Sequence, residues 1–169
     1  MGGKNIVYWD TCIFIAHITN EQRDDPMDQL GVVEFANLFD MGQVDLVTST
    51  ITLTEFLETS VPAEDYKLFL QLFSRKNLQL TDVSRDIAEL AGEIRSYYRS
   101  NINNSTISTP DCIHIATAIQ MKCDVLQTFD GSGNRPGILD LTSPIAEKYN
   151  LRIEKPKPSE SNPQLILNL

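Results

Sequence analysis

The sequence has no apolar run long enough to cross a membrane. It has 169 residues, of which 41% are hydrophobic, and no segment approaches the roughly 20 consecutive apolar residues of a transmembrane helix. The first residues, MGGKN, also lack the basic and then apolar plan of a secretory signal peptide. We therefore expect one globular domain with no membrane association.

Cysteine is scarce as well. The three cysteines, Cys12, Cys112 and Cys123, form no Cys-x-x-Cys pair. An odd number of separated cysteines suits a reducing compartment better than a disulfide framework. The sequence therefore predicts a cytoplasmic protein.

Basic residues are outnumbered, and the deficit lies in one part of the chain. The formal net charge is −9, which disfavours broad, nonspecific binding to nucleic acid. Residues 21–65 hold eleven acidic residues and a single base, Arg23, whereas the rest of the chain is nearly balanced. A polyanion could therefore approach the second half while the acidic stretch faces elsewhere.

Short apolar runs alternate with segments of helical periodicity along the chain. Strands are predicted at residues 6–9, 45–49, 78–83, 124–129 and 151–155. Helices are predicted at residues 11–18, 27–41, 51–60, 63–73 and 84–99, and after Thr109, which is expected to cap a helix that has Pro110 in its first position. This alternation indicates a three-layer α/β/α fold with a mostly parallel sheet. We expect the domain to span residues 1–155, followed by a flexible, proline-rich tail at residues 156–169.

Four carboxylates are expected to converge at one edge of this sheet. Asp10 lies inside the apolar stretch IVYWDTCIFIA, at the end of the first strand, and Asp130 ends the fourth. Glu55 lies in the helix after the second strand, and Asp111 opens the helix before the fourth. In open α/β sheets the ligand site lies outside the carboxyl ends of the strands, where these four positions meet.

Converging carboxylates need positive charge. Two unit charges about 5 Å apart repel by roughly 3 kcal/mol at an effective dielectric constant near 20. Mg²⁺ and Mn²⁺ prefer oxygen ligands, and a pair of such ions can stabilise both oxygens of a phosphoryl displacement. We therefore predict that Asp10, Glu55, Asp111 and Asp130 bind Mg²⁺ or Mn²⁺ and that no catalytic histidine is required.

Four segments carry a family resemblance. IVYWDTCIFIA, TSTITLTEFLE, STPDCIHIATAI and LQTFDGSG resemble, in order and spacing, the four acidic motifs of PIN domains, over roughly residues 5–155. The resemblance implies a doubly wound α/β/α fold and a metal-dependent endoribonuclease, many members being toxins of toxin–antitoxin pairs. It assigns the acidic positions to the four carboxylates named above, and it places supporting hydroxyls at Thr11 and Thr128.

The expected partners follow from this interpretation. We expect an RNA substrate, an antitoxin-like protein and a homodimer. Arg135, five residues after Asp130, is the preferred phosphate-binding candidate, although it could be a plain loop residue. Arg95 and Arg99, in the segment IRSYYRS, could clamp single-stranded RNA, or they could lie on a solvated helix face.

Several alternatives stay open on sequence alone. Glu58 lies one turn from Glu55 and could take its place, although Glu55 fits the motif better. Cys12 and Cys112 could line the pocket or be small buried residues. His17 and His114 are interpreted as core or surface residues.

Two other functions are compatible with parts of the sequence. A catalytically weak or inactive PIN-fold module that binds RNA or protein is the main alternative function. A phosphotransferase with Asp10 as nucleophile is disfavoured, because Cys12 stands where a second aspartate is usual.

Overall fold

The computed structural model describes residues 4–101, 107–131 and 136–159 and contains one five-stranded sheet. Its strands are β1 (Asn5–Trp9), β2 (Val44–Ser49), β3 (Leu78–Thr81), β4 (Val125–Gln127) and β5 (Arg152–Glu154). Its helices are α1 (Thr11–Thr19), α2 (Pro26–Asp40), α3 (Ile51–Glu58), α4 (Ala63–Leu72), α5 (Arg85–Asn101), α6 (Thr109–Gln120), the 3₁₀ helix η1 (Ile138–Leu141) and α7 (Thr142–Tyr149). Within the described ranges, no helix has the length and apolar character of a membrane span.

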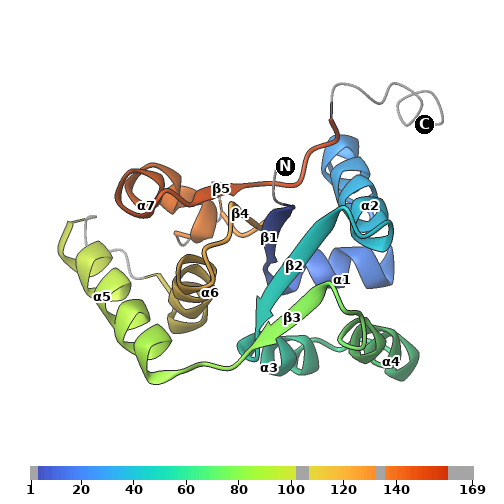
Figure 1. Ribbon diagram of the computed structural model, residues 1–169, viewed down its shortest axis with the longest axis horizontal. Helices are drawn as coiled ribbons and strands as arrows, with labels where there is room; N and C mark the ends of the chain where they lie inside the picture. Colours follow the sequence, from blue (N-terminus) through green and yellow to red (C-terminus); the bar gives the residue numbers. More distant parts are fainter. Residues whose placement is uncertain (1–3, 102–106, 132–135, 160–169) are drawn as a thin grey trace.

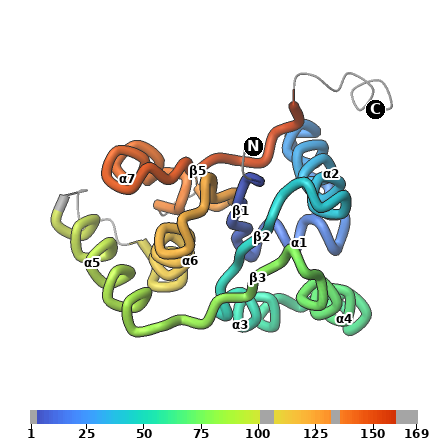
Figure 2. Tube along the Cα trace, viewed as in Figure 1, coloured from blue at the N-terminus to red at the C-terminus, as the bar shows by residue number. Residues whose placement is uncertain are grey.

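The sheet has the strand order β3-β2-β1-β4-β5, and every neighbouring pair is parallel (Figures 1 and 2). From the central strand β1 the chain adds β2 and β3 on one side, and it then returns to add β4 and β5 on the other. The direction of winding therefore reverses between β1 and β4, which is where ligands bind in folds of this type. The predicted α/β fold is confirmed.

Alternating side chains of β1 reach two separate cores, one on each face of the sheet. Tyr8 packs into the core shared with α5, α6 and α7, whereas Val7 and Trp9 pack into the core shared with α1, α2, α3 and α4. Figure 1 shows these helix groups on opposite sides of the strands. Both faces are covered, so the carboxyl edge of the sheet is left to form a site.

The structure differs from the sequence prediction in two local features. The 3₁₀ helix η1 and helix α7 lie in a segment for which the sequence pattern predicts no helix or strand. Helix α6 is capped by Ser108, one residue before the predicted cap Thr109. The Ser108 hydroxyl accepts the Asp111 N–H at 3.1 Å, and the Asp111 carboxylate accepts the Ser108 N–H at 3.2 Å. Ser108 and Thr109 are both suitable N-cap residues, and this reciprocal capping box with Asp111 favours Ser108.

The segment after β5 lies against helix α2. Lys155 Nζ donates to the buried carboxylate of Asp28 at 2.8 Å. A Cβ atom at Gly31 would lie 2.3 Å from the carbonyl oxygen of Pro156, so only glycine permits this approach. The Ser159 N–H donates to the Glu34 carboxylate at 2.8 Å, so the chain stays packed on α2 through residue 159. The remainder of the predicted tail, residues 160–169, lies outside the described residues.

Candidate metal centre

Asp10 is fixed at the carboxyl end of β1, where it also caps helix α1. Its side chain is buried, with a residue exposure of 6%. Oδ1 accepts the Thr11 N–H at 2.6 Å, and Oδ2 accepts the Thr128 hydroxyl at 2.6 Å and the Cys12 thiol at 3.3 Å. Burial and the Asp10 charge raise the pKa of Cys12, so that side chain remains a thiol donor. The buried carboxylate is thus held by donors from the first turn of α1 and from Thr128, directly after β4.

Glu55 reaches the same edge from helix α3. Its Oε2 atom accepts a hydrogen bond from the Thr11 hydroxyl and contacts His114 Nε2 at 2.7 Å. Burial acts to raise the pKa of Glu55, but the hydrogen bonds from His114 and Thr11 and the charge of His114 lower it below its ordinary value. Glu58, the alternative in the sequence, is exposed one turn further on. Of the two glutamates, Glu55 is the one that contacts the other candidate site residues.

His114 occupies the centre of this arrangement, which the sequence interpretation missed. Its buried ring contacts Glu55 through Nε2, approaches Asp10 Oδ1 at 3.2 Å through the same atom, and contacts the Tyr8 hydroxyl at 2.7 Å through Nδ1. Burial acts to lower the pKa of His114, but the charges of Asp10 and Glu55 and the hydrogen bond to Glu55 raise it. Its position one turn after Asp111 on α6 was the available signal.

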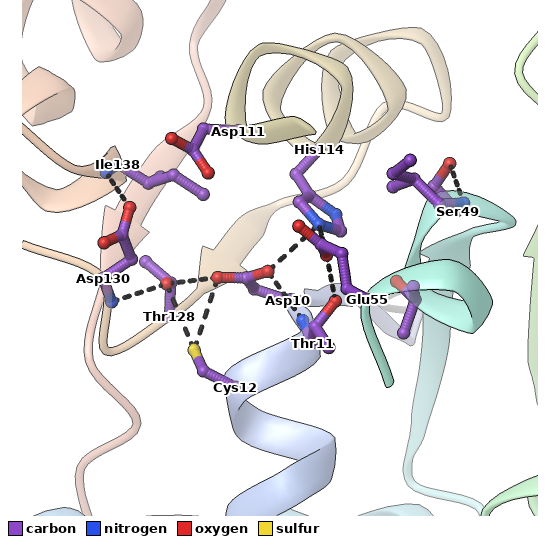
Figure 3. A network of polar contacts seen from close by, with 12 residues as sticks. Asp10, Thr11, Cys12, Ser49, Glu55, Asp111, His114, Thr128, Asp130 and Ile138 are labelled. Carbon is purple, nitrogen blue, oxygen red and sulfur yellow. Dashed lines mark hydrogen bonds and ion pairs between the residues drawn. The ribbon is translucent and has the colours of Figure 1, made fainter. Parts of the chain in front are cut away.

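Asp111 and Asp130 approach the centre from the other side of Asp10 (Figure 3). Asp130 is held by its own N–H, which donates to the Thr128 hydroxyl at 2.9 Å, and by the Ile138 N–H, which donates to its carboxylate at 2.9 Å. A Cβ atom at Gly137 would lie 2.6 Å from that carboxylate, so glycine is needed beside it. Asp111 is held at the first turn of α6 by its capping box.

The electrostatics differ between the two sides of Asp10, with His114 on one side and Asp111 and Asp130 on the other (Figure 3). Burial raises the pKa of Asp111, and the charges of Asp130 and Asp10 raise it further, against hydrogen bonds from Ser108. Burial likewise raises the pKa of Asp130, and the charges of Asp10 and Glu55 add to the effect. The imidazole of His114 meets Asp10 and Glu55, whereas no cation lies within salt-bridge distance of Asp111 or Asp130 among the described residues. The acids therefore repel one another and lack positive charge on the side of Asp111 and Asp130.

This donor set fits a hard divalent cation. Asp10, Glu55 and His114 each offer one ligand atom within 4.8 Å of the others, and Asp111 and Asp130 add two carboxylates nearby. Carboxylate oxygens suit both Mg²⁺ and Mn²⁺. The structure joins two of the four predicted metal ligands directly with His114, and it places the other two outside that trio.

The three predicted arginines lie in different settings. Arg95 on α5 donates to the Ile107 carbonyl at 3.3 Å, which places it beside the start of α6. Arg99 is exposed on the last turn of α5, and Arg135 lies outside the described residues. A further cation was missed in the sequence: the Arg23 guanidinium lies 4.0 Å from the ring centroid of Phe129, the residue before Asp130.

Comparisons with known proteins agree with this geometry. The PIN domain family model matches residues 7–136. None of the curated proteins matches the sequence significantly. A structure of VapBC2 from Rickettsia felis, bound to a DNA fragment from its promoter, matches with a TM-score of 0.53 and 19% identity over 73% of this chain and 86% of that chain.

Mycobacterium tuberculosis VapC20, a toxin that cleaves the sarcin-ricin loop, matches with a TM-score of 0.55. It is 16% identical, and the match covers 75% of this chain and 91% of that chain. At these identities the two structures bear on the fold alone. The family model covers most of the chain, and the chain belongs to the PIN domain family.

Proposed function

We propose that this protein is a Mg²⁺- or Mn²⁺-dependent endoribonuclease. One observation carries the proposal: four acids gather at the β1–β4 switch point, and burial and the charges of neighbouring acids raise the pKa values of two of them, Asp111 and Asp130. Such an arrangement destabilises an empty site and favours a bound cation. Membership of the PIN domain family supports the same conclusion.

The site residues fall into groups with different proposed roles. Asp10, Glu55, Asp111 and Asp130 would hold the cation, and Thr128 fixes Asp10 and the Asp130 backbone through one hydroxyl. When bound, a divalent ion supplies positive charge for a phosphate and activates water. Arg95, Arg99 and Arg135 are proposed to contact the RNA backbone, since guanidinium groups pair with phosphate oxygens.

The test is cleavage of single-stranded RNA with Mn²⁺ by variants that differ at matched positions. Glu55→Gln removes the half-buried site carboxylate, whereas Glu58→Gln removes an exposed one on the same helix. We expect Asp10→Asn, Asp111→Asn and Glu55→Gln each to lower the cleavage rate at least roughly a hundredfold, because each variant removes one charged ligand of the proposed ion. Each tenfold step corresponds to about 1.4 kcal/mol in the activation barrier. Glu58→Gln is expected to cleave at the wild-type rate.

Two outcomes would contradict the proposal. Full activity of Asp10→Asn, in a preparation free of contaminating nuclease, would show that cleavage does not depend on this site. Binding of RNA by the wild type without any cleavage, in either ion, would favour the alternative of an inactive PIN-fold module.

We further propose that the protein acts as the toxin of a toxin–antitoxin pair. The similarity in fold to a VapBC complex and to a toxin supports this, and so does the acidic stretch at residues 21–65, which would attract a basic partner. A growth arrest in a bacterial host that requires Asp10, and that the neighbouring open reading frame relieves, is the expected result. Growth arrest by the Asp10→Asn variant would refute it.

A homodimer and a cytoplasmic location complete the proposal. The three cysteines are free thiols, which suits a reducing compartment. Light scattering after size-exclusion chromatography tests the dimer, and a monomeric mass at micromolar concentration would exclude it.

A further inference from the structure

Tyr8, His114 and the half-buried Glu55 form a row of polar contacts between the sheet and two helices. The Tyr8 hydroxyl lies 2.7 Å from His114 Nδ1, and His114 Nε2 lies 2.7 Å from Glu55 Oε2. Tyr8 and His114 are both fully buried, with a residue exposure of 0%. Both ring nitrogens of His114 are therefore engaged by side chains from β1 and α3, and no water is needed to complete the row.

The contacts fix where the imidazole carries its proton. A carboxylate oxygen has no hydrogen to give, so a contact of 2.7 Å from Nε2 to Glu55 requires a hydrogen on Nε2. The Tyr8 hydroxyl can donate to a bare Nδ1 or accept from a protonated one. Nε2–H is therefore present in the cationic ring and in one of the two neutral tautomers, and the other tautomer would set a lone pair against Glu55. The donor role does not depend on the charge of His114.

The two carboxylate oxygens of Glu55 differ in their hydrogen bonding because of this donor. Oε2 accepts from both Thr11 and His114, whereas Oε1 accepts no hydrogen bond from residues 4–101, 107–131 or 136–159. Asp10 Oδ1 accepts the Thr11 N–H and lies 3.2 Å from the same Nε2 atom. The imidazole thus lies between two carboxylates that would otherwise repel, donates to one of them, and leaves Oε1 of Glu55 to meet a cation.

We propose that His114 is a positioning residue of the metal centre, whose Nε2–H sets Glu55 and Asp10 in place for a divalent ion and whose ring is itself held by Tyr8. The proposal rests on the proposed function, since it assumes that these carboxylates bind metal. Groups that orient metal ligands from behind typically contribute about 10–100-fold to affinity. The role assigned to His114 is of this kind, and it differs from direct coordination.

Binding of Mn²⁺ and of Mg²⁺ to the full chain, measured by calorimetry without RNA, tests the proposal. His114→Leu removes the donor, and we expect both ions to bind about 10–100-fold more weakly. His114→Gln restores an N–H near the position of Nε2 and is expected to recover most of that loss. Tyr8→Phe frees the ring and is expected to weaken both ions about 3–10-fold.

Tyr98→Phe is the matched control for Tyr8→Phe. Tyr98 is also buried, but its hydroxyl has no hydrogen-bond partner among the described residues. We therefore expect its removal to leave the affinity for both ions unchanged. Circular dichroism of every variant establishes that the fold is retained, and if His114→Leu does not fold, Tyr8→Phe and His114→Gln decide the matter.

The alternative outcomes separate cleanly. Wild-type affinity in His114→Leu, or in Tyr8→Phe if His114→Leu does not fold, would overturn the positioning role while leaving the proposed function intact. A loss in His114→Leu and His114→Gln that is confined to Mn²⁺ would also overturn it, because imidazole ligation favours Mn²⁺ over Mg²⁺ and would mark direct coordination. A wild-type chain that binds neither ion would refute the metal centre itself, and with it both proposals.

Discussion

Replacement of Thr128 by valine isolates the hydroxyl that joins the Asp10 carboxylate to the backbone N–H of Asp130. Valine keeps the shape of the buried side chain but removes the donor to Asp10 and the acceptor for the Asp130 N–H. A hydrogen bond to a charged group contributes about 1.5–3 kcal/mol, and an unsatisfied buried N–H costs about 1–3 kcal/mol. Allowing for partial relief by water, we expect the free energy of unfolding to fall by about 3 kcal/mol. For a chain of this size that lowers the melting temperature by about 6–12 °C.

Thermal unfolding at neutral pH in EDTA is the assay, with Thr117→Val as the matched control. Thr117 is equally buried, but its hydroxyl donates only to the Ile113 carbonyl of its own helix, at 2.7 Å. Its loss should cost about 1 kcal/mol or less, and Thr128→Ser should retain most of the wild-type stability. If Thr128→Val and Thr117→Val melt within about 2 °C of each other, the Thr128 hydroxyl does not hold an ionised Asp10, and the reasoning fails.

Two further predictions concern stability. Gly31→Ala should lower the free energy of unfolding by about 1–3 kcal/mol, because the new methyl group collides with the Pro156 carbonyl. The control Gly92→Ala, in open space on α5, should raise the free energy of unfolding by about 0.5–1 kcal/mol. Equal effects of the two variants in urea unfolding would contradict the packing of Pro156 on α2. Because burial raises the pKa of Asp111 in the folded state, its charged form destabilises the fold at neutral pH, and this penalty disappears as the pH falls below the unfolded value. Asp111→Asn should therefore raise the melting temperature in EDTA at pH 7 but not near pH 3, and Mn²⁺ should stabilise it less than the wild type; equal responses to Mn²⁺ would show that Asp111 is not a ligand.

The sequence predicted the fold, and with it the sheet edge at which Asp10 and Asp130 lie, because both follow from local patterns. The short apolar run before Asp10 and the run before Asp130 could be recognised as parallel strands, and parallel strands place their ends together. Glu55 was preferred to Glu58 on its motif, and the structure finds Glu58 exposed. These inferences needed only the order of the elements.

The features that the sequence did not predict depend on contacts between residues far apart in the chain, or on a choice between two residues that are equally suited to the same role. His114 looks like an ordinary apolar-face histidine until Tyr8 and Glu55, 106 and 59 residues away, are brought against it. Ser108 and Thr109 are both good caps, and the choice depends on the reach of a side chain. Helix α7 is only eight residues long and has Pro144 in its first turn, so its formation depends on packing of Ile145 rather than on local preference.

The distance along the chain between Asp10 and Thr128 has a consequence for protein synthesis. The two residues are 118 positions apart, yet one hydrogen bond joins them, and β1 lacks its neighbour β4 until that part of the chain exists. Contacts of such long range form late, because closing the intervening loop costs entropy before any contact is gained. A nascent chain on the ribosome therefore carries Asp10 and Glu55 long before it can assemble them with Thr128 and Asp130. Translation must pass the fourth strand before the centre can form, so a product truncated before β4 lacks the contacts of Thr128 and Asp130 that hold the centre together.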